Sequence, residues 1–600
     1  MTHPAPTANN DHDDSTTRTT TTTSSSTSST AATLSTKLLH QCRLLLAELD
    51  TFLAALATRL RRHQQQQHLT EMRQLRSNVF SELRTLERLA ADAAAAAAAA
   101  AKTYGGDDGA AADAADVAES ERRLLHALRS SNLPFYVAVW TVAKKRCMGV
   151  VAFGKRFYWD DDHHHHHHDE HNVVDDKEEC GMKSKDNEDE DAISIPPTTA
   201  TGKKKRPSKD KRKSVFVDIV ADNGEEWVKV STISENRLLF EMAEKGWDRD
   251  DESDDDALVS GGEDAEEERQ RYDRKKKSLH STDTDEEDQI ELVKLASDMA
   301  KAARAVRVRY RHPRIRFVMP KIVEGSIPEI DAVLNDIRSY GVTVECGTHV
   351  PDVLNDELDG SRDPSSVTPE DLPLSTLLPN PYEKFTPTLN VDCTLLLALV
   401  SDVSHIRHIA PSPSHHRAIR RQIELEEEQP LVPSELWPAM VGRHLICTEE
   451  AAKRMREIVD IIGTDTEKER TAILMGDRGS DTLDLLQRFQ RLSDHEIPRE
   501  WLIPIKVVNA QPDINAGLQD GKLPPVAHKV TAALSVINRS VFLYGWVKGI
   551  VTVTSNRTVV KQIENIIEEN RGGDDALQGP QVWVCDTARS LVGKEKNRRP

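Results

Sequence analysis

Hydrophobic residues along the chain fall into segments of helical or alternating spacing, separated by long polar stretches with neither pattern. Leucines recur at helical spacing from Thr36, and further helical patterns cover residues 70–91 and 117–130. The tract Ala93–Ala101 has high helix propensity but little surface to bury, so we expect it to fray or to extend into solvent. These patterns predict an N-terminal helical layer over residues 36–131, suited to serve as a scaffold or to bind a protein partner.

Residues 132–346 mix alternating and helical patterns, which predicts an α+β domain. The apolar segment FYVAVWTVAKKRCMGVVAF after Leu133 indicates two strands, and KRFYW follows it. Residues 215–233 predict a hairpin, because alternating apolar residues flank the turn at Asn223 and Gly224. Helical and strand patterns then alternate through IELVKLASDMAKAARA, RIRFVMP, PEIDAVLNDIRSYG and VTVEC, which indicates parallel strands.

Three polar stretches interrupt these patterns. Residues 160–213 and 248–287 are highly charged insertions that we expect to be disordered, and residues 347–384 are rich in Pro, Asp and Ser, typical of a linker. The first insertion contains the histidines His163–His168, which suit transition metals but lack the fixed geometry of a site. It ends in the basic run Lys203–Lys213, which matches a nuclear localisation signal or a phosphate-contacting patch, and equally a solvated linker.

Strands and helices alternate again in residues 385–600, which predicts an α/β domain with a parallel sheet. Its first strand is an apolar run that ends in Asp392 and turns directly into a helix. Open α/β sheets bind ligands at the carboxyl ends of their strands. A buried carboxylate is also costly unless it is paired or binds a cation. Asp392 is therefore the leading candidate for a functional residue.

Other titratable residues of this domain admit simpler explanations. Glu449 and Glu450 follow Thr448, a good helix N-cap, so helix capping accounts for both acids. His405 and His408 have a spacing that can chelate metal, but without a third clustered ligand we predict solvent-exposed histidines.

Two motifs of the C-terminal domain resemble the PIN-like superfamily of compact three-layer α/β nucleases. The segment NVDCTLLLALVSD is similar to the opening motif of PIN domains, and Thr554-Ser555-Asn556 to their later T-N-D motif, with Asn556 in place of the acid. The resemblance implies Mg²⁺ or Mn²⁺ held by Asp392 with Glu449 or Glu450, and a weaker contribution from Asn556. The helix over residues 526–544, where PIN domains often place another acid, carries Asn538 and Arg539 instead.

The chain as a whole is similar to an uncharacterised eukaryotic family, the domain of unknown function 1308 family, which has a PIN-like C-terminal domain. The segments that carry this likeness are VDIVADNGEEWVKV, LNVDCTLLLALVSDVSH and the ending ARSLVGKEK. The family brings no established activity with it.

Three functional hypotheses follow. In the first, Asp392, Glu449, Glu450 and Asn556 form the centre of a metal-dependent nuclease acting on RNA or DNA phosphodiesters. In the second, the site is degenerate and the protein is a non-catalytic adaptor for nucleic acid or for a protein partner. The residues expected to contact nucleic acid are Arg557 and Lys561, which begin a helix, and Arg314 and Arg316 in an arginine-dense band.

The third hypothesis places a restriction-nuclease-like magnesium site on the hairpin. Asp218, Glu226 and Lys229 are the residue types of such a site, but Glu226 stands one position too early and should face the other side of its strand. An exposed hairpin with cross-strand charge pairs is the simpler interpretation.

Composition narrows the class of protein. The 600 residues carry a net charge of −20 with 38% hydrophobic and 4% aromatic residues, which indicates two or three domains and substantial disorder, including a Thr- and Ser-rich tail over residues 1–35. The seven cysteines are scattered, which argues against a disulfide framework. No signal peptide is evident and no apolar run approaches the roughly 20 residues that span a bilayer. We therefore expect a cytoplasmic or nuclear protein that does not enter membranes.

Overall fold

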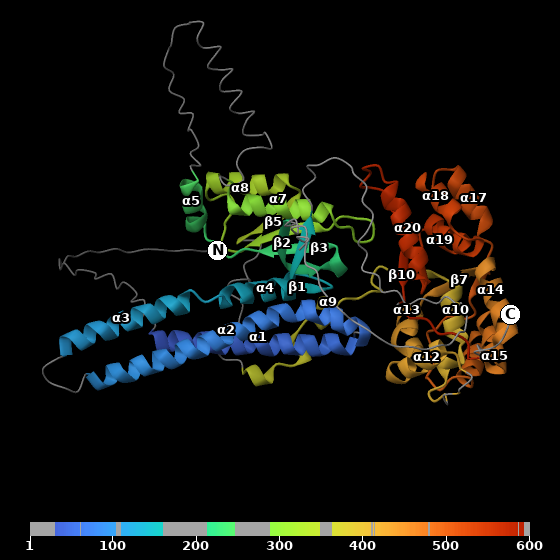
Figure 1. The fold of residues 1–600 in the computed structure, drawn as a ribbon, viewed down its shortest axis with the longest axis horizontal. Helices are drawn as coiled ribbons and strands as arrows, with labels where there is room; N and C mark the ends of the chain where they lie inside the picture. The colour runs from blue at the N-terminus through green and yellow to red at the C-terminus, as the bar shows by residue number, and fades with distance from the viewer. Residues whose placement is uncertain are drawn as a thin grey trace, which may run out of the picture. The chain divides into compact units, whose positions relative to one another are not determined.

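The computed structural model is a mixed α/β structure with two five-stranded sheets and a helical N-terminal region (Figure 1). The residues that it describes are 30–59, 62–103, 110–159, 213–245, 289–347, 363–409, 412, 415–477, 481–585 and 587–592. They divide into two compact units, one drawn from Met1–Ala47, Asn78–Pro134 and Glu357–Val367 and the other from the rest of the chain.

The predicted helical N-terminus is confirmed. Its helices are α1 (Ala31–Arg59), α2 (Arg62–Thr103) and α3 (Ala110–Arg129). Within the first unit α1 lies beside α2 (Figure 1), and an exposed ion pair joins Arg43 and Glu87 at 3.2 Å. The alanine tract continues α2 to Thr103 instead of fraying, and its residues up to Ala98 are mostly exposed. The predicted N-terminal tail is shorter than expected, because α1 already begins at Ala31.

Of the two strands predicted after Leu133, the end of the second and the KRFYW segment after it do form a strand, over residues 152–159. The first is wrong, because it folds as helix α4 (Leu133–Arg146). Its aromatic and β-branched residues favour a strand locally, but tertiary packing overrides that preference. In the second unit the buried Trp140 donates its indole N–H to Glu48 Oε2 at 2.6 Å, and Lys144 Nζ lies 2.7 Å from the same oxygen. Glu48 thus fixes the helix at two positions one turn apart.

The first sheet has the order β1-β2-β3-β4-β5, with antiparallel pairing from β1 to β3 and parallel pairing from β3 to β5. Its strands are β1 (Ala152–Trp159), β2 (Lys213–Ala221), β3 (Glu226–Val230), β4 (Arg314–Met319) and β5 (Val342–Cys346). Its helices are α5 (Glu235–Glu244), α7 (Glu291–Arg304) and α8 (Pro328–Ser339). The predicted hairpin is β2–β3, with Ala221 opposite Glu226 and positive φ angles at Asp222, Asn223 and Gly224 in the turn.

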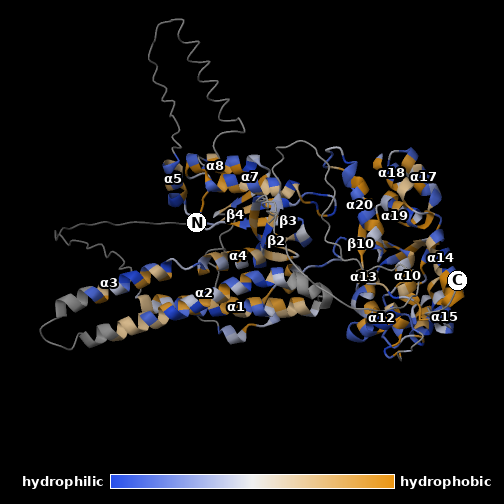
Figure 2. Cartoon of the chain, viewed as in Figure 1, coloured by the Kyte–Doolittle hydropathy of each residue, from blue (hydrophilic) through white to orange (hydrophobic). Residues whose placement is uncertain are grey.

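The second sheet has the order β10-β9-β6-β7-β8, and all its strands are parallel, as predicted. They are β6 (Thr388–Val391), β7 (His444–Thr448), β8 (Lys506–Val508), β9 (Val551–Thr554) and β10 (Val582–Val584). The helices of this region are α9 (Leu374–Leu377), α10 (Cys393–Val400), α11 (Asp402–His405), α12 (Arg417–Glu428), α13 (Trp437–Met440), α14 (Glu449–Ile462), α15 (Asp465–Leu474), α16 (Thr482–Gln490), α17 (Gln511–Gln519), α18 (Val526–Ala533), α19 (Val536–Lys548) and α20 (Arg557–Glu569). In Figure 2 helix α20 carries both hydrophobic and hydrophilic residues, as expected for a helix with one buried face.

The direction of chain growth in this sheet reverses at β6. The chain adds β7 and β8 on one side of β6 and then β9 and β10 on the other. Such a reversal leaves a crevice beyond the carboxyl ends of the two central strands, here β6 and β9. Helix α19 packs closely on this sheet at Gly545, where a Cβ atom would lie 2.1 Å from Thr552 Oγ1.

Several predictions fall outside the described residues. These are the insertions 160–213 (apart from Lys213) and 248–287, with the histidine run and nearly all of the basic run that the first one contains. Among the helices that the structure does describe, none is both long and apolar enough to cross a bilayer.

Candidate functional site

Asp392 lies at the reversal point of the second sheet, directly after β6 and before α10. Its side chain is buried, and Oδ2 accepts hydrogen bonds from Thr394 Oγ1 at 2.8 Å and from Thr554 Oγ1 at 2.7 Å. Its backbone N–H donates to Val553 O at 3.0 Å. The carboxylate therefore connects the carboxyl ends of β6 and β9.

The segment after β9 is folded around the same hydroxyl groups. Thr554 Oγ1 accepts a hydrogen bond from Asn556 N at 2.9 Å, and Ser555 N donates to Thr394 Oγ1 at 3.2 Å. Asn556 is the N-cap of α20, and its Oδ1 accepts from Val559 N at 3.3 Å. The amide that replaces the expected acid thus satisfies an otherwise unpaired N–H of the helix.

The two predicted glutamates stand in the first turn of α14, at the carboxyl end of the neighbouring strand β7. Thr448 caps this helix by accepting from Ala451 N at 3.3 Å, as predicted, and its hydroxyl lies 3.0 Å from Ser540 Oγ on α19. Glu449 is exposed, where its charge suits the helix N-terminus. Glu450 is half-buried, and its Oε2 is buried without a hydrogen-bond partner.

These residues do not fit the metal site that the resemblance implies. Hydrolysis by metal-activated water needs several carboxylates to hold divalent cations against phosphate charge. Within the described ranges no group of three or more Asp, Glu, His or Cys residues is arranged to hold a metal ion. Asn556 carries no negative charge, and the Ser540 hydroxyl of α19, a neutral group, lies against Thr448.

The two cations predicted to contact phosphate, Arg557 and Lys561, line one groove on α20. The groove encloses about 660 Å³ and is otherwise formed by Ala533 at the end of α18 and by α20 itself. Both side chains are exposed and stand one helical turn apart, immediately after the Asn556 cap. The groove therefore begins next to the segment that is hydrogen-bonded to Asp392.

The arginine band of the first sheet is engaged within the chain. Arg316 is 7% exposed, and its guanidinium donates to both carboxylate oxygens of Glu226, at 3.2 and 3.0 Å, and to Glu345 at 3.3 Å. Arg314 is exposed but pairs with Asp222 at 2.7 Å. The anionic partners of these two arginines are therefore acids of the protein itself, and Arg316 has little surface left for a phosphate.

The hairpin residues do not assemble the magnesium site of the third hypothesis. Asp218 and Lys229 form a cross-strand pair at 3.2 Å, and Val230 N also donates to Asp218 at 2.8 Å. Asp218 is buried and Lys229 is half-buried, and burial raises the pKa of Asp218. Glu226 instead binds Arg316, so the two acids serve different partners.

Sequence patterns did not predict a buried polar network around Asp402 in the domain of the second sheet. Asp402 accepts from Arg470 Nη1 at 2.7 Å, and both side chains are almost fully buried. The hydroxyls of Thr464 and Thr466 donate to the same carboxylate at 2.6 Å each. Burial raises the pKa of the neighbouring Glu467, although three backbone N–H groups donate to its side chain. Every charge in this network has a partner, as expected of a structural element.

His405 belongs to the same region, and the prediction that it is solvent-exposed is wrong. Its Nε2 lies 2.8 Å from Leu399 O and its Nδ1 3.0 Å from Ser493 Oγ, inside the protein. Burial lowers the pKa of His405 to about 3, so the ring is neutral. His408, three residues later, is exposed, so the two histidines do not form a metal-binding pair.

Comparison with known proteins adds one finding. The fold and site define a mixed α/β protein with a doubly wound parallel sheet and an acidic residue at its reversal point. Residues 389–480 match the model of a family described as "Protein of unknown function (DUF1308)". No curated protein and no solved structure matches the chain. The matched segment contains Asp392, Glu449 and Glu450 and ends before the α20 groove.

Proposed function

We propose that this protein binds RNA or DNA through the α20 groove, on a PIN-like domain whose acidic centre is degenerate. The observation that carries the proposal is the position of Arg557 and Lys561. Both line one groove on the helix that starts beside the Asp392 centre. Paired cations along a groove are the usual way to follow a phosphate backbone.

The strand order supports the PIN-like assignment. The sheet is fully parallel and reverses at β6, and the two motifs that resemble PIN domains lie at the carboxyl ends of the two central strands. A hydrogen bond between Asp392 and Thr554 joins these motifs directly. Fold alone does not define activity, so the choice between nuclease and adaptor depends on the centre itself.

The centre favours an adaptor. Oδ2 of Asp392 is occupied by two hydroxyl donors, and Asn556 acts as a helix cap. The described residues supply too few clustered carboxylates to support hydrolysis assisted by Mg²⁺ or Mn²⁺.

One observation keeps the nuclease as a second candidate. Glu450 Oε2 is buried without a hydrogen-bond partner at the same edge of the sheet as Asp392. A buried carboxylate oxygen normally has a partner, and a cation is one that would satisfy it.

Binding of labelled single-stranded RNA to the full chain, measured by fluorescence anisotropy, tests the proposal. The double charge reversal Arg557→Glu with Lys561→Glu should weaken binding at least tenfold and lower the slope of log affinity against log salt by roughly 1.4. The matched control reverses Arg499 and Lys522, two exposed cations outside the groove, with the same change in net charge. Equal loss in both variants would contradict the proposal.

A cleavage assay on the same RNA with Mn²⁺ separates the two candidates. The adaptor should bind the RNA and leave it intact. Cleavage that disappears in both Asp392→Asn and Glu450→Gln variants, with RNA binding retained, would establish the nuclease instead.

A further inference from the structure

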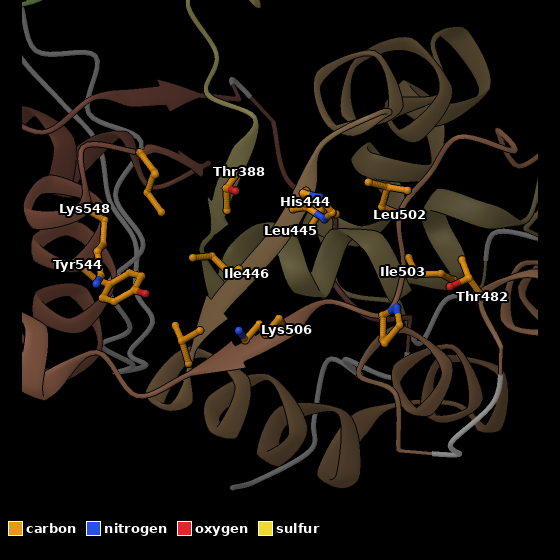
Figure 3. A pocket seen from close by; sticks show the side chains of 13 residues that line it. Thr388, His444, Leu445, Ile446, Thr482, Leu502, Ile503, Lys506, Tyr544 and Lys548 are labelled. Carbon is orange, nitrogen blue, oxygen red and sulfur yellow. The ribbon is translucent and has the colours of Figure 1, made fainter.

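We propose that the second sheet carries another binding site, at the opposite end from Asp392, for a small organic anion with an apolar body. The site is a pocket of about 670 Å³ between the face of β6–β8 and the C-terminal turns of α19 (Figure 3). This volume lies within the usual range for small-molecule sites, roughly 300–1,000 Å³.

Strand register builds one wall of the pocket. Thr388 is directly opposite His444, and Ile446 is directly opposite Lys506, in the parallel pairs β6–β7 and β7–β8. Side chains at alternate positions of a strand share one face, so His444 with Ile446, and Lys506 with Val508, project to the same side. Figure 3 shows the labelled members of this set around the hollow.

Helix α19 builds the facing wall. It is held over the sheet by hydrogen bonds from Asn390 Nδ2 to Val541 O at 2.8 Å and between Ser540 and Thr448 at 3.0 Å. One to two turns further along α19, Tyr544 and Lys548 project toward the pocket (Figure 3).

The position of the pocket separates it from the Asp392 centre. Thr388, His444 and Lys506 are the first residues of β6, β7 and β8, whereas Asp392 follows the last residue of β6. The pocket therefore starts at the amino ends of the strands and extends along the sheet face to Val508, and it shares no lining residue with the Asp392 centre or the α20 groove. A ligand bound there would occupy a site independent of the proposed nucleic-acid interface.

The pocket lining combines apolar surface with positive charge. Its apolar members include Ile446, Leu502, Val508 and Ile550. Its basic members are His444, Lys506 and Lys548, and no acid is among the residues that line it. A concave surface that carries lysines and no acid is complementary to an anion.

The two lysines differ in how they are held. Lys548 Nζ pairs with Asp513 at 2.8 Å and lies 5.8 Å from the ring centre of Tyr544, so it is fixed against the wall. Lys506 is exposed, and the structure shows no acid within ion-pair distance of it among the described residues. Lys506 is therefore the cation available to the head group, and the apolar wall beside it favours a ligand with a hydrocarbon body.

Displacement of the fluorescent dye anilinonaphthalene sulfonate, which is itself an apolar anion, tests this site in the full chain. The dye should bind saturably, and octanoate should displace it, whereas inorganic phosphate should not, because it has no apolar body. Lys506→Glu should raise the dissociation constant about tenfold, as expected when an attractive charge becomes repulsive. Lys522→Glu, an exposed charge reversal outside the pocket, should leave it unchanged.

Two further variants make the result decisive. Val508→Phe should abolish the Lys506-dependent binding by filling the pocket, and Arg557→Glu with Lys561→Glu should leave dye binding intact. Equal affinity in Lys506→Glu and Lys522→Glu would overturn the proposal, as would competition by inorganic phosphate equal to that by octanoate. Because Lys506 is exposed, its replacement tests the site even if the Val508 variant fails to fold.

Discussion

Thr554 donates its hydroxyl hydrogen to Oδ2 of Asp392 at 2.7 Å, across a sequence separation of 162 residues. The bond joins the ends of the two strands at which the second sheet reverses. It also uses one of the carboxylate lone pairs that a metal ion would need. The contact that ties the ends of β6 and β9 together therefore gives Asp392 a structural role.

Replacement of Asp392 should act on stability. Asp392→Asn weakens two hydrogen bonds to a charged acceptor, and we expect a loss of about 2 kcal/mol in the free energy of unfolding. Thr554→Val removes one of these bonds at nearly constant volume and should cost about 1 kcal/mol. Urea unfolding of the two single variants and of the double variant gives the interaction free energy between Asp392 and Thr554. An unchanged stability in Asp392→Asn, together with lost Mn²⁺-dependent cleavage, would contradict the structural role.

The buried pair of Asp402 and Arg470 should be among the most sensitive points of the C-terminal domain. Arg470→Met leaves a buried carboxylate without its charged partner and should destabilise the domain by about 3–5 kcal/mol. The matched control is Arg456→Met, whose ion pair with Asp477 is partly exposed and should contribute less than about 1 kcal/mol. Chemical denaturation measures the free energy of unfolding of both variants. Similar losses of stability in the two variants would show that the buried network stabilises the domain no more than a surface ion pair does.

His405 should make stability fall as the pH is lowered. Its pKa is about 3 in the folded protein, because burial disfavours the charged ring, and about 6.5 when unfolded. Between these values the unfolded state binds the additional proton, so stability declines by up to about 1.4 kcal/mol per pH unit as pH falls below 6.5.

The variant His405→Gln removes this titration, so its free energy of unfolding should decline less steeply between pH 6.5 and pH 5. Unfolding midpoints at matched pH values test the difference. His495, whose pKa burial also lowers, remains in both proteins and so cancels from the comparison. Parallel curves of stability against pH for wild type and variant would contradict the lowered pKa of His405.

The segment that follows β10 should depend on a second buried ion pair for its attachment. Arg589 Nε donates to Glu426 Oε2 at 2.6 Å, and both side chains are buried. Arg589→Met should destabilise the domain by about 3 kcal/mol and expose the segment to limited proteolysis. Arg454→Met, which breaks the exposed pair with Glu457, provides the control. Equal protease resistance in the two variants would show that the ion pair does not hold the segment.

Local patterns were sufficient where an element's own residues determine it. The β2–β3 hairpin follows from alternating side chains around a turn that needs positive φ, and the Thr448 cap of α14 follows from its hydroxyl. Alternation of strands with amphipathic helices likewise predicted the parallel pairing of β3 to β5 and of the whole second sheet. Patterns failed for α4, because its composition suits a strand, whereas the distant Glu48 binds two of its side chains, Trp140 and Lys144.

The sequence by itself determined the alternating elements, the position of Asp392 at a strand end and the β2–β3 hairpin with cross-strand charge pairs, since each depends on periodicity or on a short turn. Only the tertiary structure decided where these charges lie and what surrounds them. It buries Arg316 between Glu226 and Glu345, makes Asn556 a helix cap and places Arg557 and Lys561 along one groove. It also brings the first residues of β6, β7 and β8 together around a pocket without acids. Burial and partner choice depend on residues far apart in the chain, and no local pattern encodes that proximity.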